Sequence, residues 1–223
     1  MLAAEVQAVE AALTQSLPAG RARLAYLVSR DTSALSEAQV REAAIETLAE
    51  NFNDSFIAPL FCFALGGLPA AALYRYANTA DASWGYIGLR AGRDWTDAGR
   101  FAARADDALS WLPARLTAAL FLIAAQAGFT RKNTKNTLKN LSLEASKTPS
   151  PNSGWPMAAM ALLLQLRLGK TGVYQLNPQG DLPQAPHVRA ALRLCRHTWL
   201  GVICLLAIAG VFLLAYGQAF FYT

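Results

Sequence analysis

Charged side chains are scarce in this chain, at 16% of residues against 54% that are hydrophobic. A soluble globular domain usually carries about a quarter charged residues, so the composition argues against an ordinary water-soluble protein. The C-terminal stretch Thr198–Thr223 contains no charged residue at all. Because a helix needs about 20 apolar residues to cross a bilayer, we predict a transmembrane helix over residues 198–222.

Signatures of several common protein classes are also missing. The three cysteines and two histidines do not have the spacing of a zinc or redox site. The chain has no P-loop of the Walker type, so any ATP site must be of another kind. The start is an Ala-rich amphipathic segment and lacks the basic-then-apolar order of a signal peptide.

The net charge of +5 is basic, but the basic residues lack the aromatic interleaving of a nucleic-acid surface. We therefore expect no nucleic-acid partner. We assign the excess of Lys and Arg to cytoplasmic loops beside membrane segments, following the positive-inside rule.

What the chain does have is a stripe of carboxylates that runs into an apolar segment. Ser36 and Gln39 have the spacing of a capping box, which predicts a helix start. Three glutamates then recur at four-residue spacing and form one acidic stripe on that helix: Glu42, Glu46 and Glu50. Polar residues follow where we expect the helix to fray: Asn51, Asn53 and Asp54.

A solvated helix face is one interpretation of this stripe. Two observations argue against it. Arg41 is the only nearby cation in sequence, so the like charges repel one another. The stripe also leads directly into FIAPLFCFALGG, where unpaired polar groups cost free energy. A divalent cation with a phosphorylated substrate would resolve the conflict.

The apolar segment 56–77 is interrupted by Pro59, Gly66-Gly67 and Pro69. Such a segment kinks or re-enters in a membrane when neighbouring helices satisfy its freed backbone groups. It ends in polar residues that share one helix face: Arg75, Asn78 and Asp81. These three residues form either a second wall of the site that contains the acidic stripe or a polar helix end after a membrane segment.

The remaining elements are predicted from local patterns. We expect helices over 2–16 and 21–30 with a break at 17–20, a new helix starting at Pro113, a basic loop at 131–140 and a Gly/Pro-rich surface loop at 171–186. On the helix before Pro113, Arg104 and Asp107 have the spacing of an intrahelical ion pair.

The turn Ser150–Gly154 precedes a helix with Pro156 in its first turn. A helix start of this kind suits a phosphate, although the same pattern is typical of a capped turn. We expect this turn and the helix after Pro156, which includes Met157, to face the acidic stripe.

Five segments, in their order and at their intervals, resemble one known family: RDT, ETLAENFNDSFIAPLF, YRYANTADASWGY, AARADDALSWLPAR and SPNSGWPMAAMA. They are similar to the membrane-bound adenosylcobinamide-phosphate synthases of cobalamin biosynthesis. The likeness covers roughly residues 20–205. It implies an all-α, integral membrane helical bundle with amphipathic and broken helices, which we expect to form a single membrane-embedded domain over 1–223.

The resemblance implies an ATP- and Mg²⁺-dependent amide ligation of adenosylcobyric acid with aminopropanol or its phosphate. It places the protein in the bacterial inner membrane as a multi-pass protein and makes the corrinoid, the amino-alcohol phosphate and the lipid bilayer its partners. A homo-oligomer is an open alternative.

The site residues follow by motif. The implied catalytic residues are Glu46, Glu50, Asn51, Asp54 and Asp81, and the metal ligands are Glu50 and Asp54. The implied substrate- and phosphate-binding residues are Arg30, Asp31, Arg75, Asn78, Arg104, Asp106, Asp107, Arg115, Ser150, Asn152 and Gly154.

The sequence departs from the family pattern at three places. Met157 stands where the family usually has Glu, Ser110 where it commonly has Asn, and Ala80-Asp81-Ala82-Ser83 where it reads Leu-Asp-(Ser/Ala)-Met. The alternative to an enzyme is therefore a related membrane sensor or modulator without this catalysis.

Overall fold

The computed structural model describes residues 1–85, 88–90, 92–128 and 134–221. Two short antiparallel hairpins are the only sheets among these residues, and helices make up the rest of the regular structure. The elements are α1 Leu2–Gln15, α2 Leu17–Leu24, α3 Glu37–Phe52, the π-helical turn η1 Asn53–Ile57, α4 Ala58–Trp84, β1 Leu89–Arg90, β2 Arg93–Asp94, α5 Thr96–Gly128, α6 Thr134–Ala145, α7 Gly154–Leu163, β3 Leu168–Lys170, β4 Tyr174–Leu176 and α8 Ala185–Phe221.

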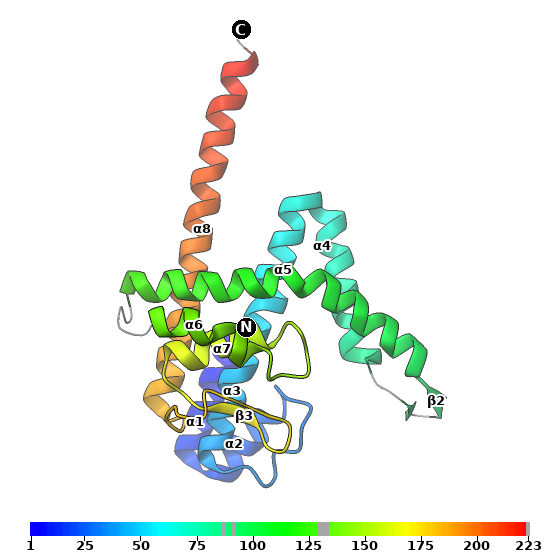
Figure 1. Cartoon of the computed structure of the whole chain (residues 1–223), viewed down its shortest axis with the longest axis vertical. Coiled ribbons are helices and arrows are strands. Elements are labelled where there is room, and N and C mark those ends of the chain that lie inside the picture. Colours follow the sequence, from blue (N-terminus) through cyan, green and yellow to red (C-terminus); the bar gives the residue numbers. More distant parts are fainter. Residues whose placement is uncertain (86–87, 91, 129–133, 222–223) are drawn as a thin grey trace.

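The helices form a body from which two elements project. Figure 1 shows α1–α3, α6, α7 and the β3–β4 hairpin packed together, with α4 and α8 rising on the same side and α5 running across them. Within the part of the chain that the structure describes, three helical stretches are long and apolar enough to cross a membrane: Glu37–Trp84, Thr96–Gln126 and Ala185–Phe212. The predicted all-helical membrane class is confirmed.

The predicted break at 17–20 is wrong. Ser16 is the N-cap of α2, since its hydroxyl accepts a hydrogen bond from the Ala19 N–H at 3.2 Å. Pro18 then fits the first turn, where no intrahelical donor is needed. The helix therefore covers residues 17–20 and ends at Leu24 instead of continuing to residue 30.

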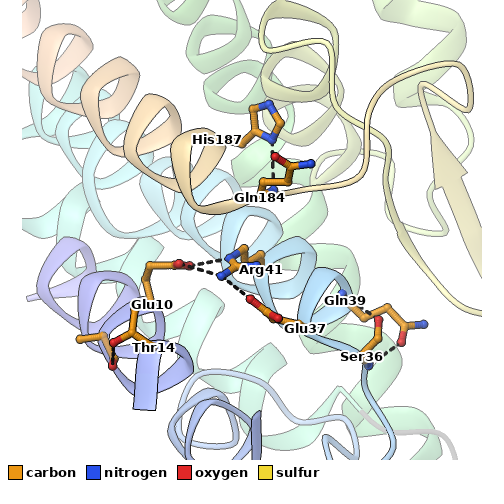
Figure 2. Close-up of polar contacts among 9 residues, drawn as sticks. Glu10, Thr14, Ser36, Glu37, Gln39, Arg41, Gln184 and His187 are labelled. Carbon is orange, nitrogen blue, oxygen red and sulfur yellow. Dashed lines mark hydrogen bonds and ion pairs between the residues drawn. The ribbon is translucent and has the colours of Figure 1, made fainter. Parts of the chain in front are cut away.

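Helix α3 begins with the predicted capping box. The Ser36 hydroxyl accepts from the Gln39 N–H at 3.3 Å, and the Gln39 side chain accepts from the Ser36 N–H at 2.8 Å (Figure 2). One turn later, Arg41 donates to Glu10 of α1 at 2.8 and 2.9 Å and pairs with Glu37 at 2.6 Å. Arg41 thus joins α1 to α3.

The predicted fraying after Glu50 is also wrong, because the helix continues through η1 into α4. Asn53 is 3% exposed and accepts a hydrogen bond from the Thr117 hydroxyl of α5 at 2.9 Å. A buried side chain with a tertiary partner replaces the expected helix end. Single π-helical turns of this kind frequently occur at functional sites.

Helix α4 consists of two helical arms that form a hairpin. This agrees with the prediction that the apolar segment 56–77 kinks or re-enters. Gly66 (φ −143°, ψ 21°) and Gly67 (φ 63°, ψ −156°) leave the helical region, and the chain turns back at this point (Figure 1). The conformation of Gly67 is one that side chains other than glycine rarely adopt. The turn returns the polar end of the second arm to the level where the first arm began.

Helix α5 continues through Pro113, so the predicted new helix start there is wrong. The lost N–H of a proline is tolerated where neighbouring helices hold the segment.

Helix α6 replaces most of the predicted loop 131–140, and residues 131–133 lie outside the described residues. The predicted surface loop 171–186 contains strand β4, which pairs with β3 so that Lys170 faces Tyr174 in register.

The hydrophobic core lies between α3, α5, α7 and α8, with α1 and the β3–β4 hairpin packed against it. Nearly every residue of α7 is buried, which explains why this segment is so apolar. Because α7 is central, the turn before it and the carboxylates of α3 lie on neighbouring elements.

Candidate active site

A cavity of about 320 Å³ brings together segments that are far apart in sequence. We call it the acidic cavity. Its polar lining comes from the loop before α3, from α3 itself, from the turn before α7 and from the β3–β4 hairpin: Ser29, Arg30, Glu46, Thr47, Glu50, Asn51, Ser150, Ser153, Lys170 and Tyr174. Met157 of α7 also lines this cavity, as the sequence predicted when it placed the turn before α7 opposite the acidic stripe.

Glu46 is held from two sides at the wall of the acidic cavity. It is 3% exposed, and Arg30 pairs with it at 2.8 Å. The Tyr174 hydroxyl donates to its other oxygen at 2.8 Å. The expectation that Arg30 pairs with a carboxylate is confirmed, and the solvated-face interpretation is wrong for Glu46.

Tyr174 is suited to a permanent donor role. Burial raises the pKa of its phenol, and the neighbouring charge of Glu46 raises this pKa further. The hydroxyl therefore stays protonated near neutral pH. It also lies 3.8 Å from the Met157 sulfur, which is a weak acceptor.

Glu50 lies one turn beyond Glu46 and connects this cavity with a second group of acids. Its carboxylate interacts electrostatically with Glu46, Asp54 and Asp106, and with the cation Lys170. Asn51 lines the same cavity and donates to the Thr47 carbonyl at 3.1 Å.

The second group, which we call the carboxylate cluster, lies where the two arms of α4 meet α5. It consists of Asp54, Asp81, Asp106 and Asp107, and Asp106 interacts electrostatically with the other three. Tyr74, on the returning arm, is fully buried; its hydroxyl is 3.5 Å from Asp54 Oδ1 and 3.2 Å from the Ser110 hydroxyl.

The polar face predicted for the end of α4 joins this cluster. Arg75 donates to the Asp54 backbone carbonyl at 3.1 Å and to Asn78 at 3.3 Å. Asn78 in turn donates to Asp106 of α5 at 3.1 Å. The hairpin of α4 is what brings these residues opposite Asp54, so the interpretation as a second wall of the site is favoured over a simple helix end.

The turn before α7 connects to α5 through Asn152. This side chain is 4% exposed and donates to the Asp107 backbone carbonyl at 2.8 Å and to its carboxylate at 3.3 Å. Its oxygen lies 3.4 Å from the Arg115 guanidinium. The Ser150 hydroxyl accepts from the backbone N–H groups of Asn152 and Ser153, each at 3.2 Å, and so shapes the turn.

Two residues implied by the resemblance, Asp31 and Arg104, lie apart from these contacts. Asp31 is exposed, and its carboxylate accepts hydrogen bonds from the Ser33 N–H and hydroxyl at 2.8 and 2.9 Å, which lower the pKa of this carboxyl. Arg104 is exposed on α5. Both Arg104 and Asp107 are described, and the structure shows no ion pair between them.

Gly154 serves close packing. A Cβ there would lie 2.1 Å from the Ala145 carbonyl oxygen and 2.4 Å from the Thr148 hydroxyl. The position therefore needs glycine for the approach of α6 to α7, independently of any phosphate.

Sequence reasoning missed Lys170, Tyr174 and Tyr74. For the first two a signal was available, because LGKTGVYQL places a glycine in a short loop between alternating strands, which indicates a hairpin. No local pattern distinguishes Tyr74 from the other aromatic residues of α4, since its partners come from η1 and α5.

Among the described residues, no group of three or more His, Cys, Asp or Glu side chains is arranged to hold a metal ion. Mg²⁺ does not require such a group, because it commonly binds through one or two carboxylates together with water and substrate phosphates. Glu50 and Asp54 interact electrostatically and supply oxygen donors of the type that Mg²⁺ prefers. This donor set fits the predicted ion.

These features define an all-α membrane protein in which carboxylates, arginines and a lysine gather near an apolar helical hairpin, with Glu46 buried among them. The family model described as CobD/Cbib protein matches residues 1–195. The chain therefore belongs to the CobD/Cbib family, as the sequence motifs indicated.

Relatives from archaea and bacteria support this membership. The chain is 41% identical over 213 residues to the probable cobalamin biosynthesis protein CobD of Methanothermobacter thermautotrophicus, covering 96% of this chain and 69% of the relative. It is 45% identical over 166 residues to CobD of Halalkalibacterium halodurans, covering 73% and 49%. With CobD of Brucella melitensis it shares 42% identity over 168 residues, covering 75% and 50%.

The chain thus matches about half the length of the second and third of these relatives and about two thirds of the first. No solved structure matches the chain.

Proposed function

We propose that this protein acts in cobalamin biosynthesis as an ATP-dependent ligase that joins adenosylcobyric acid to aminopropanol or its phosphate. The observation that carries the proposal is the acidic cavity, in which carboxylates of α3 face two cations and the hydroxyl-rich turn before α7. The names of the relatives, cobalamin biosynthesis protein CobD, agree with this role.

The reaction has two steps. The γ-phosphoryl group of ATP moves to a carboxylate oxygen of the corrinoid, which gives an acyl phosphate and ADP. The amine nitrogen then attacks the acyl carbon, phosphate leaves with the C–O bond electrons, and the nitrogen loses a proton as the amide forms. Catalysis of phosphoryl transfer depends mainly on positioning and charge stabilisation.

The residues of the acidic cavity suit these needs. Arg30 and Lys170 bind anionic phosphate oxygens, and the Ser150 turn adds hydroxyl groups. The phosphate that leaves accepts the proton lost by the amine nitrogen, because the Glu50 carboxylate is a Mg²⁺ ligand in this proposal. Glu46 keeps Arg30 in position, because its second oxygen is already bound by Tyr174.

In this proposal Glu50 and Asp54 hold Mg²⁺, which when bound neutralises phosphate charge. The carboxylate cluster, with Arg75 and Asn78, lies outside the lining of the acidic cavity and is connected to it through Glu50, which interacts with Asp54 and Asp106. It is the proposed binding surface for the polar amide groups of the corrinoid.

A second candidate is a related membrane protein that binds these substrates without joining them. Met157 favours it, since this buried thioether lines the acidic cavity at 3.8 Å from Tyr174. A thioether is a poor ligand for Mg²⁺ and a weak hydrogen-bond acceptor.

The test is ligase activity of the purified protein with ATP, Mg²⁺, adenosylcobyric acid and aminopropanol phosphate, followed by mass spectrometry of the corrinoid. Glu50→Gln retains the size of the side chain and removes its charge. We expect it to lower the rate by about a hundredfold or more.

The matched control is Glu37→Gln on the same helix, whose side chain is 57% exposed. It should retain wild-type activity. Full activity of Glu50→Gln would exclude the proposed site, whereas substrate binding without any product from the wild type would favour the second candidate.

For localisation we propose the cell membrane of a bacterium, with the acidic cavity facing the cytoplasm where ATP is available. The apolar hairpin of α4 and the uncharged part of α8 support membrane attachment.

A further inference from the structure

A second cavity adjoins the acidic cavity and has a different lining. It has a volume of about 330 Å³ and lies between α5, α6 and the turn before α7. Pro149 and Ser150 line both cavities, so they meet along this turn. We call the second one the stack cavity, after the Arg115 guanidinium and the Trp155 indole that are stacked at its wall.

The wall contains the Arg115 guanidinium group and the Trp155 indole, and a second indole, that of Trp111, stacks on Arg115 from outside the cavity lining. The Arg115 guanidinium carbon lies 4.0 Å from the Trp111 ring centroid and 4.7 Å from the Trp155 ring centroid. Arg115 also donates to the Trp111 carbonyl at 2.6 Å. Trp155 and Arg115 both line the stack cavity, so a flat cationic and aromatic surface borders it.

We propose that the stack cavity binds the purine base of a nucleoside triphosphate whose phosphates extend into the acidic cavity. This inference rests on the proposed function and adds a location for the base. Indole and guanidinium planes are the surfaces on which bases stack in proteins. The shared turn Pro149-Ser150 gives the ribose a path from the stack to the cations Arg30 and Lys170.

A third polar cavity of about 450 Å³ also borders the acidic cavity, through Lys170 and Tyr174, but it suits a different group. Its charged lining residues are Glu42, Arg167 and Lys170, and its lining includes no tryptophan. Arg167 and Tyr174 also line it, but the structure shows no stacking contact between these two described side chains, and the Tyr174 hydroxyl is already bound to Glu46. The base is therefore assigned to the stack cavity.

The experiment compares binding of ATP and inorganic tripolyphosphate to the full chain in detergent with Mg²⁺, by calorimetry and without corrinoid. Wild type should bind ATP about 10- to 100-fold more tightly than tripolyphosphate, because stacking adds affinity only to the ligand with a base. Trp155→Ala should lose this preference and retain its affinity for tripolyphosphate.

Two further variants control for folding. Trp155→Phe retains a stacking ring and should retain most of the preference for ATP. Trp84→Ala removes a partly exposed indole that lines neither polar cavity and should bind as wild type does.

Equal affinity of wild type for the two ligands would overturn the base subsite, and so would an unchanged preference in Trp155→Ala. A wild type that binds neither ligand would overturn the proposed function as well. A wild type that prefers ATP but forms no amide would support the base subsite and exclude the proposed ligase activity.

Discussion

At the residue scale, Met157 is the position where the sequence differs most consequentially from its family pattern. It is 2% exposed and contacts the Tyr174 hydroxyl within the acidic cavity. The prediction that this residue faces the acidic stripe is confirmed. Its side chain contributes packing but no charge to the acidic cavity.

Met157→Glu should raise ligase activity by about a hundredfold if a carboxylate is needed there, because one charge-assisted contact to the transition state has about this effect. The same substitution should lower thermal stability without Mg²⁺, since it adds a buried charge beside Glu46 and Glu50. Rates and melting temperatures, each with and without Mg²⁺, are the measurements.

Met157→Gln is the matched control, because it has a similar size and no charge. It should show no gain in rate. A wild type that already turns over rapidly, with no change in Met157→Glu, would mean that residue 157 takes no part in the chemistry.

Tyr174→Phe tests the hydrogen bond to Glu46. The substitution leaves one oxygen of a buried carboxylate without its partner, which costs about 1–3 kcal/mol of stability. Urea denaturation in detergent measures this loss. Tyr26→Phe, at a side chain that is 82% exposed, should be neutral, and equal stability of both variants would show that the Glu46 contact contributes nothing.

At the element scale, the α4 hairpin decides how the chain enters the membrane. Composition alone allows Glu37–Trp84 to cross, yet the backbone breaks at Gly66 and Gly67. At about 1.5 Å per residue, the arm Ala58–Leu65 is too short to span the hydrocarbon core by itself. Exposed Leu65 and Leu68, at 74% and 73%, flank the turn and suit contact with lipid.

We therefore expect α4 to re-enter and to return to the side from which it started. Single cysteines at exposed Ser55 and Ser83, in a background without the three native cysteines, should both react with a membrane-impermeant maleimide from the cytoplasmic side. Ser33→Cys, in the exposed loop before α3, marks that side. Labelling of Ser55 and Ser83 positions from opposite sides would show a full crossing instead.

At the scale of the whole molecule, α8 extends beyond the other helices on the same side as the tip of α4 (Figure 1). From Thr198 its residues are uncharged, and exposed apolar side chains such as Leu205 and Val211 are 63% and 67% accessible. Because α5 runs across α8 in Figure 1, α5 should lie along the membrane surface when α8 crosses.

The expected orientation places the arginines before Thr198, which are Arg189, Arg193 and Arg196, on the cytoplasmic side. A reporter fused after Thr223 should then be active outside the cytoplasm. Residues 222–223 lie outside the described residues, so the fusion tests the crossing and not the end of the helix. Activity of the fusion only in the cytoplasm would contradict this topology.

The sequence by itself determined the elements that depend on local chemistry. Three such features depend only on neighbouring residues, and each was predicted. They are the capping box at Ser36, the uncharged run after Thr198 and the broken apolar segment around Gly66. The motifs likewise indicated the family, and they carry most of the polar residues that line the acidic cavity, except Ser29, Lys170 and Tyr174.

Only the tertiary structure decided which of those polar residues meet. Arg30, Glu46 and Tyr174 contact one another across separations of 16 and 128 residues, and Asp54 meets Tyr74 and Arg75 because α4 turns back. Pro113 and the residues 17–20 were misjudged for a related reason, because packing and a cap override local breaking signals. Side-chain partners depend on how helices pack, and no pattern of neighbouring residues encodes that arrangement.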